Sequence, residues 1–283
     1  MTGRVDAHIH FWDLRVREQP WMVGPALDPI RRNFSVDDLA PLAAAAGITA
    51  TVVVQTVGVP EETPEFLQVA AGNELVAGVV GWVDLTSPAV GDALAALRER
   101  PDGAWLKGIR HQVHDEEDPR WLCRDDVRRG LAAVAEAGLA YDLLTRTPHL
   151  PAALDTVAAL PELSFVVDHI SKPDIGSGAD MGPWATDLRE LAAFSNVTCK
   201  LSGMVTETSW TDWTVGDLRP YVDVVLDAFG PDRVMFGSDW PVCLLAASYG
   251  DVVDAAEQLT AGLSHAERDS IFGDTARRVY HLT

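Results

Sequence analysis

The chain opens with a strand-like segment that contains two histidines, Gly3-Arg4-Val5-Asp6-Ala7-His8-Ile9-His10-Phe11-Trp12. Apolar and polar side chains alternate through its middle, which is the period-two pattern of a β-strand with two different faces. His8 and His10 therefore point to the same side of the strand. Two imidazoles at this spacing can bind one divalent cation, and they can equally be ordinary polar histidines. The segment alone leaves both interpretations open.

A second segment, far along the chain, favours a functional role for the histidines: Arg233-Val234-Met235-Phe236-Gly237-Ser238-Asp239-Trp240-Pro241. A short apolar run places the carboxylate of Asp239 at its end. Pro241 then stops the strand, because proline cannot donate a ladder hydrogen bond. We therefore expect Asp239 to join His8 and His10 in one site.

Composition excludes several classes of protein. The formal net charge of −20 argues against nucleic acid and anionic membranes as partners, because phosphate-binding surfaces are basic. The three cysteines lie far apart without a CxxC pair, which argues against a disulfide framework or a thiolate zinc site and fits a reducing cytoplasm. We expect no leader before the first strand, and no apolar run approaches the roughly 18 residues of a membrane span. We expect one cytoplasmic domain over residues 1–283.

Strand-like and helix-like segments alternate along the chain. The second expected strand, 49–55, is β-branched almost throughout and apolar on both faces, as a buried parallel strand requires. The remaining expected strands are 76–83, 104–110, 139–145, 164–169, 197–201 and 234–239, and the expected helices are 35–47, 61–72, 88–100, 127–137, one from about 150, 184–194, 215–229 and a closing helix over 263–282. About eight such units predict an α/β fold, a single-domain (β/α)₈ TIM barrel. No Gly-rich fingerprint follows the first strand, which argues against a dinucleotide-binding open sheet.

The active site of a TIM barrel lies at the carboxyl ends of its strands. Polar residues gather at those ends in this chain: His8, His10, Gln55, Asp84, Arg110, His111, Asp142, Thr145, Asp168, His169, Lys200, Ser202 and Asp239. Because Asp and Ser commonly cap helices, each of them taken singly has a structural explanation. Coincidence is harder to sustain for the set of His8, His10, His169 and Asp239.

Several segments, spread over nearly the whole chain, resemble the amidohydrolase superfamily. They are Val5-Asp6-Ala7-His8-Ile9-His10-Phe11-Trp12, Leu106-Lys107-Gly108-Ile109-Arg110, Asp168-His169-Ile170-Ser171-Lys172-Pro173, Lys200-Leu201-Ser202-Gly203 and Phe236-Gly237-Ser238-Asp239-Trp240-Pro241. The third and the last resemble the branch that contains L-fuconolactonase, L-rhamnonolactonase and 2-pyrone-4,6-dicarboxylate lactonase. The resemblance implies a barrel hydrolase that opens a lactone.

The resemblance also implies a set of metal ligands. The first-strand pair of the superfamily falls on His8 and His10, its mid-barrel histidine on His169 and its last-strand aspartate on Asp239. This set suits one Zn²⁺ or Mn²⁺. Lys107 lies within its strand rather than clearly at the tip, so a second metal bridged by a carboxylated lysine is not expected. Some lactonases of the branch work without metal, so the expected cofactor is one divalent metal or none.

Lactone hydrolysis needs a base for water, an electrophile for the carbonyl and a proton for the ring oxygen. We expect Asp239 to move the protons, with His169 beside it as a metal ligand or as a hydrogen-bond donor to the oxyanion. Expected substrate contacts are Arg110, Trp12, Trp240, Asp142 and Lys107. The guanidinium suits a carboxylate or vicinal hydroxyls, and the indoles can stack on a sugar ring. Trp21, Trp82, Trp184, Trp210 and Trp213 are further indole candidates, for which ordinary packing is the simpler explanation.

Three functions stay open on the sequence. The first is hydrolysis of a small-molecule lactone such as L-fucono- or L-rhamnonolactone. The second is metal-dependent decarboxylation of an aromatic or muconate-type acid, which uses the same ligands. The third is a barrel that binds without catalysis, against which the complete set of histidines and aspartate argues. Assembly into a homo-oligomer is compatible with each of them.

Overall fold

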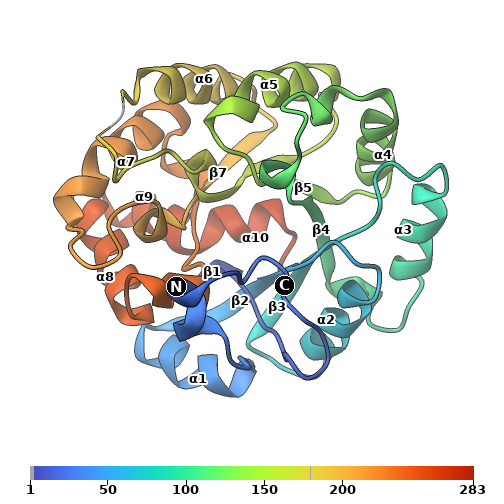
Figure 1. Cartoon of the computed structure of the whole chain (residues 1–283), viewed down its shortest axis with the longest axis horizontal. Coiled ribbons are helices and arrows are strands. Elements are labelled where there is room, and N and C mark those ends of the chain that lie inside the picture. Colours follow the sequence, from blue (N-terminus) through green and yellow to red (C-terminus); the bar gives the residue numbers. More distant parts are fainter. Residues whose placement is uncertain (1–2, 179) are drawn as a thin grey trace.

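Eight parallel strands form the centre of the computed structural model, which describes residues 3–178 and 180–283. They pair in chain order: β1 (Arg4–Ile9), β2 (Ile48–Val54), β3 (Val76–Gly81), β4 (Leu106–His111), β5 (Ala140–Leu143), β6 (Phe165–Val167), β7 (Val197–Leu201) and β8 (Val234–Phe236). Ile9 and Trp240 form a parallel bridge between the ends of β1 and β8, and the backbone N–H of His10 donates to the Trp240 carbonyl at 2.7 Å. The sheet is therefore a nearly closed barrel (Figure 1), and the predicted TIM-barrel fold is confirmed.

The helices are α1 (Val36–Ala45), α2 (Glu62–Ala71), α3 (Val90–Arg98), α4 (Asp125–Glu136), α5 (Leu150–Ala159), α6 (Gly182–Ala192), α7 (Val215–Phe229), α8 (Tyr249–Leu259), α9 (His265–Asp269) and α10 (Thr275–Val279). Helices α1 to α8 surround the barrel on its outer side, whereas α10 lies behind the strands near the centre of the view (Figure 1). The predicted helices match α1 to α7 to within a few residues. Within the described part of the chain, none of the helices has the length and apolar character needed to cross a membrane.

Among the strands that are shorter than the sequence predicts, β6 and β8 both end just before a proposed site residue. β6 stops at Val167 instead of residue 169, and β8 stops at Phe236 instead of residue 239. The chain then turns into left-handed backbone conformations, with φ of 53° at His169 and 58° at Asp239. Such conformations are uncommon for residues other than glycine and interrupt the extended ladder. The apolar pattern does not report this change of direction.

The last part of the chain differs most from the prediction. Helix α8, which follows the last strand, is absent from it, although Ser248 and Asp251 form a capping box at its start. The expected closing helix begins at the predicted cap Ser264 but contains a π-helical turn over Ser270–Asp274 between α9 and α10. Apolar residues of its end pack inside the barrel against Val5 and Ala7 of β1.

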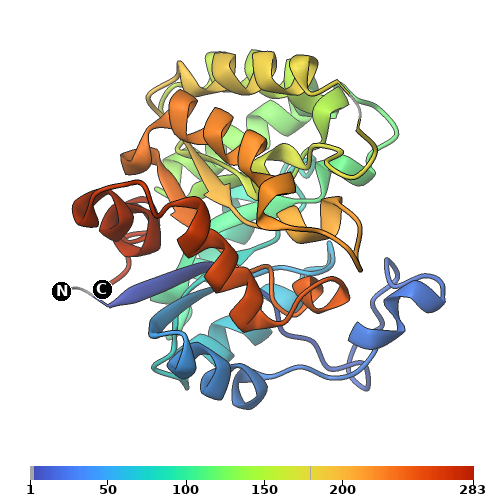
Figure 2. The ribbon, with the colours of Figure 1, turned by 90° about the vertical axis from the view of Figure 1, so that its left-hand side faces the viewer.

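Figure 2 shows both chain ends at one end of the barrel, where β1 begins, and the loop from β1 to α1 at the opposite end. Tyr280 and Leu282 are buried at the first end. The carboxyl ends of the strands, with their polar residues, therefore lie at the second end, which positions the site described next.

Candidate active site

A small cavity of about 140 Å³ lies at the carboxyl ends of the strands. It is lined by His10, Trp21, Thr56, Arg110, Gln112, His114, Asp115, Leu144, His169, Lys172, Asp239 and Val242. Arg110 belongs to β4, and the other residues come from the segments that follow β1, β2, β4, β5, β6 and β8. Three of the four residues expected to form the core of the site, His10, His169 and Asp239, line it directly, and His8 lies immediately behind them.

The four core side chains converge on one carboxylate oxygen. Asp239 Oδ1 lies 3.3 Å from His10 Nε2, 3.8 Å from His8 Nε2 and 3.9 Å from His169 Nε2. His8 Nε2 is also 3.2 Å from His10 Nε2, so the two rings of β1 meet at their tips. Each of these residues is at most 5% exposed. His8 and His10 of β1 therefore form one buried group with His169 and Asp239, which are distant in the sequence.

Glycines make room for this convergence. A Cβ atom at Gly203 would lie 2.5 Å from His169 Nδ1, and Gly203 has φ of +63°. A Cβ atom at Gly237 would lie 2.7 Å from the Cβ of His8. No side chain fits at such distances, so His169 and His8 occupy their positions only because glycine follows β7 and β8.

His169 begins a run of four left-handed residues, His169, Ile170, Ser171 and Lys172, with φ between 45° and 62°. Left-handed conformations are costly for residues with a Cβ, and most costly for a β-branched one such as Ile170. The run holds both His169 and Lys172 at the cavity. Three contacts over-determine it: Lys172 N donates to His169 O, Thr145 Oγ1 bonds Ser171 Oγ at 2.7 Å, and Trp184 Nε1 donates to Ile170 O at 2.7 Å.

The histidines are oriented from behind by fixed groups. His10 Nδ1 lies 2.8 Å from the carbonyl oxygen of Val54, which can only accept, so the ring proton sits on Nδ1. His10 Nε2 then faces the carboxylate of Asp239 at 3.3 Å. His169 Nδ1 lies 2.9 Å from the hydroxyl of Ser202, which can donate or accept, and this contact also orients its ring. The Nε2 atoms of both rings therefore point toward Asp239.

The donor set suits a divalent metal ion. One ligand atom each from His8, His169 and Asp239 lie within 4.8 Å of one another, and His10 Nε2 borders the same space. Imidazole and carboxylate are common ligands of transition metals, and a ring nitrogen held from behind is the usual arrangement of such ligands. Two cations oppose a metal here: Arg110 Nη1 lies 3.3 Å from His8 Nε2, and the Lys200 ammonium 3.2 Å from His8 Nδ1.

Burial tunes the protonation of this group. It lowers the pKa of His8 and of His169 well below that of a free histidine, so both rings are neutral at pH 7. Burial alone would raise the pKa of Asp239, but the adjacent His169 and His10 outweigh it and bring that pKa below its usual value. Asp239 is therefore ionised at neutral pH and can accept a proton.

A buried ionic network supports the group from inside the barrel. Lys200 Nζ lies 2.5 Å from Asp142 Oδ2 and 3.0 Å from Asp168 Oδ1, and Tyr280 donates to Asp142 at 2.9 Å. All four residues are fully buried. Burial raises the pKa of Asp142 to about 6, while Lys200 opposes the shift. Burial would also raise the pKa of Asp168, but Lys200 and His8 reverse this and lower it.

A second buried carboxylate joins β1 to the last strand. Asp6 Oδ1 accepts from the backbone N–H of Ser238 at 2.9 Å and from that of His8 at 3.2 Å, and Asp6 Oδ2 accepts from the Tyr249 hydroxyl at 3.0 Å. Burial nevertheless raises the pKa of Asp6 to about 6. Asp6 thus fixes the position of His8 relative to Asp239 without reaching the cavity.

The expected substrate contacts divide into two groups. Arg110 lines the cavity, held by Asp168 Oδ2 at 3.1 Å and by the carbonyl of Gln55 at 2.5 Å. The structure does not bring the others there. Asp142 lies in the barrel interior, and Lys107 Nζ contacts the carbonyl of His281 at the opposite end of the barrel.

The two favoured tryptophans lie in an aromatic cluster beside the site. Trp12 packs against Trp21 and Phe34, and its Nε1 donates to Arg32 O at 2.7 Å. Trp240 is 1% exposed and packs against Phe11 and Phe34. Trp21 is the indole that lines the cavity. Trp12 and Trp240 were favoured because they lie near site residues in the sequence, but Trp21, in the loop after β1, is the tryptophan that borders the cavity.

Residue type and spacing do not predict the remaining lining residues. Lys172, Asp115 and His114 are not among the expected site residues, although all three line the cavity. Lys172 was visible as the lysine of the Asp-His-x-x-Lys-Pro segment. The other two follow β4 closely, and only the loop conformation brings them to the cavity.

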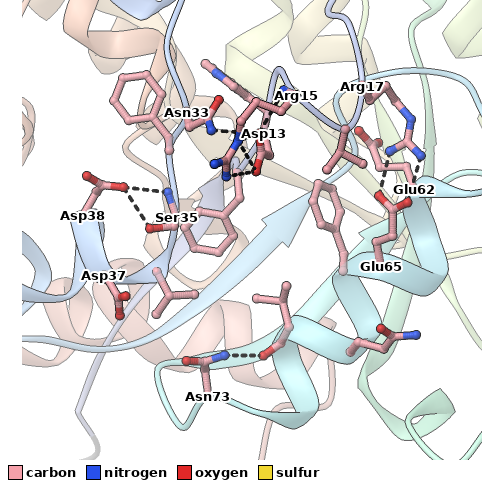
Figure 3. A pocket seen from close by; sticks show the side chains of 18 of the residues that line it. Asp13, Arg15, Arg17, Asn33, Ser35, Asp37, Asp38, Glu62, Glu65 and Asn73 are labelled. Carbon is pink, nitrogen blue, oxygen red and sulfur yellow. Dashed lines mark hydrogen bonds and ion pairs between the residues drawn. The ribbon is translucent and has the colours of Figure 1, made fainter.

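A larger hollow of about 790 Å³ lies elsewhere, between the β1–α1 loop, α1 and α2. Figure 3 shows its polar side chains engaged with one another: Arg17 with Glu65, Arg15 with Asp13, and Ser35 with Asp38. Glu62 is buried and accepts from Thr56 and Val57. His8, His169 and Asp239, which form the candidate metal-ligand group, do not line this hollow.

Comparison with known proteins agrees with this geometry. The family model described as amidohydrolase matches residues 5–282. An L-fucono-1,5-lactonase of Burkholderia multivorans is 40% identical over 99% of this chain and 96% of its own, and one of Burkholderia ambifaria is 41% identical over 89% of this chain and 84% of its own. A solved amidohydrolase from Burkholderia multivorans with bound zinc superimposes with a TM-score of 0.94, at 38% identity and 99% coverage of both chains.

Proposed function

The chain belongs to the amidohydrolase family, and we propose that it is a lactonase that opens a sugar lactone such as L-fucono- or L-rhamnonolactone. The observation that carries the proposal is Asp239, an ionised carboxylate at the floor of the cavity, set among three histidines. Relatives that are named as lactonases and are about 40% identical over nearly the whole chain support it.

Asp239 serves as the proton carrier. A lactone carbonyl is attacked by water, and the ring oxygen must leave with a proton. The Asp239 carboxylate takes the proton of the attacking water and returns it to the ring oxygen, so one group serves both steps. Its low pKa keeps it ionised at the start of the cycle.

Positive and polar groups surround the place where the carbonyl oxygen becomes negative. Arg110 lines the cavity, and its Nη1 lies 3.3 Å from His8 Nε2. Arg110 stabilises the oxyanion by donating a hydrogen bond, and such electrostatic stabilisation is often the largest contribution to catalysis of acyl transfer. A single Zn²⁺ or Mn²⁺ held by His8, His10, His169 and Asp239 would polarise the carbonyl and lower the pKa of bound water towards ~7.

The remaining lining residues bind the sugar. Trp21 offers an aromatic face to the apolar side of the ring, and Gln112, His114 and Asp115 offer donors and acceptors to hydroxyl groups. This mixture of one apolar wall and several polar groups is typical of small-molecule sites.

A pH-indicator assay of the purified protein tests the proposal. The panel contains L-fucono-, L-rhamnono- and L-galactonolactone and one pyrone dicarboxylate, each before and after chelation. Acid release from a sugar lactone is the expected result, and its sensitivity to the chelator reports the need for metal. No acid release from any lactone, with CO₂ released from an aromatic acid instead, would replace the lactonase with a decarboxylase.

A further inference from the structure

The cations at the cavity are all paired with acids of the protein itself. Among the described lining residues the only lysine and arginine are Lys172 and Arg110. Arg110 Nη1 is 3.1 Å from Asp168 Oδ2, and Lys172 Nζ is 3.0 Å from Glu207 Oε1. Each of the two cations therefore already has an acidic partner within the protein.

The second pair, Lys172 with Glu207, is formed by two loops beside the cavity, and we call this part of the cavity its mouth. Lys172 ends the left-handed run after β6, and Glu207 ends the short helix Met204–Glu207 after β7. Their side chains are 13% and 12% exposed, so water screens the pair only in part. The carbonyl of Glu207 accepts from the N–H groups of Ile175 and Gly176, which fixes its loop against the loop of Lys172.

The charges around this pair also cancel. Arg146 Nη1 approaches Glu207 Oε2 at 3.5 Å, and Asp115 lines the cavity beside Lys172. Burial lowers the pKa of His114, so that ring is neutral at pH 7. Two cations, Lys172 and Arg146, thus face two carboxylates, Glu207 and Asp115, and the charges of these four side chains cancel.

Lactone hydrolysis creates a charge that its substrate lacks. An uncharged lactone and water give a hydroxy acid, which ionises at pH 7 to a carboxylate and a released proton. An unpaired ammonium at the mouth would attract this carboxylate and delay its departure, and release of product limits the turnover of many enzymes.

We propose that Glu207 sets the charge of the cavity mouth: by neutralising Lys172, it makes the site selective for uncharged lactones and lets the anionic hydroxy acid leave. Glu207 does not line the cavity, so it is a positioning residue that acts through Lys172. The inference rests on the proposed function and adds to it the charge class of the substrate.

The test compares Glu207→Gln with Glu65→Gln. Glutamine keeps the shape and the acceptor oxygen of Glu207 but frees the charge of Lys172. Glu65 pairs with Arg17 at 2.8 Å beside the larger hollow (Figure 3), so its substitution changes the net charge equally, away from the site. The probes are L-galactonate as inhibitor and ITC ligand, L-galactonolactone as uncharged substrate and D-glucarolactone as anionic substrate.

Glu207→Gln is expected to lower the inhibition constant of L-galactonate about tenfold at low ionic strength, with a smaller gain in salt. It should also raise kcat/KM for D-glucarolactone relative to L-galactonolactone. The double variant Glu207→Gln with Lys172→Met should lose both gains, and Lys172→Met alone should weaken L-galactonate binding. The Glu65→Gln variant should show none of these changes.

Equal L-galactonate binding in wild type and Glu207→Gln, or an equal gain in Glu65→Gln, would overturn the inference. ITC measures this binding without turnover, so a protein that hydrolyses no lactone refutes the proposed function and still decides the role of Glu207. If Glu207→Gln does not fold, Lys172→Met decides the inference, since unchanged L-galactonate binding in that variant contradicts it.

Discussion

Replacing Lys200 by methionine should destabilise the protein severely. Lys200 is 0% exposed, and its ammonium lies 2.5 Å from Asp142 and 3.0 Å from Asp168. Methionine fills a similar volume but leaves two buried carboxylates without their shared cation. Removing one partner of a buried ion pair costs about 3–5 kcal/mol, because the remaining charge stays desolvated. At roughly 2–4 °C per kcal/mol for a chain of this size, the melting temperature should fall by about 10 °C.

Calorimetry at pH 7.5 measures this effect, and a second substitution identifies its cause. Burial raises the pKa of Asp142 to about 6, whereas the pKa of Asp168 is lowered. A neutral side chain at position 142 therefore removes the carboxylate that is the less favourable of the two to ionise. The double variant Lys200→Met with Asp142→Asn should therefore recover at least half of the lost stability. Arg120→Met, which breaks an exposed pair with Asp155, should leave the melting temperature almost unchanged, because solvent screens that pair. A fall below 2 °C for Lys200→Met, or a double variant no more stable than the single one, would refute the reasoning.

Three further results are expected. Gly203→Ala should lower kcat about 100-fold, because the new Cβ would displace His169. The control Gly178→Ala should keep full activity, because Gly178 has a similar φ of +67° and its Cβ would meet no atom within 4 Å. Equal rates for the two variants would show that activity does not depend on the position of His169. Trp21→Ala should raise KM about tenfold with a smaller effect on kcat, as measured by steady-state kinetics. An unchanged KM would show that Trp21 does not contact the substrate. Chelation of metal-loaded protein should lower the melting temperature by roughly 5–10 °C when metal is present at about 100 times its Kd, and identical melting curves with and without chelator would argue against metal binding.

Much of the barrel is readable from the sequence because its signals are local. The β-branched run in β2 and the capped helix α1 follow directly from residue pattern and cap chemistry. The same holds for β7 and α7, whose bounds the pattern predicts to the residue. Helix α8 carries a comparable cap at Ser248, so the same local signal would have predicted it.

The site is readable only in part, because its geometry depends on backbone conformations that the pattern does not encode. His8 and His10 share a face of β1, as expected from the period of a strand, and their ring tips meet. The left-handed turn at His169 and the approach of Lys172 have no signal in an apolar period. Lys107 lies in β4, as the sequence predicts. Its side chain points to the end of the barrel opposite the cavity, so the structure does not bring it to the expected substrate contacts.

The most direct test of the central claim is the rate of L-fuconolactone hydrolysis by the Asp239→Asn variant. Asparagine tolerates the left-handed conformation that Asp239 adopts, so the fold and the melting temperature of the metal-free protein should be kept. Loss of the proton carrier should lower kcat by about 10³-fold. A variant that melts like wild type and hydrolyses the lactone within tenfold of its rate would contradict the assignment of Asp239.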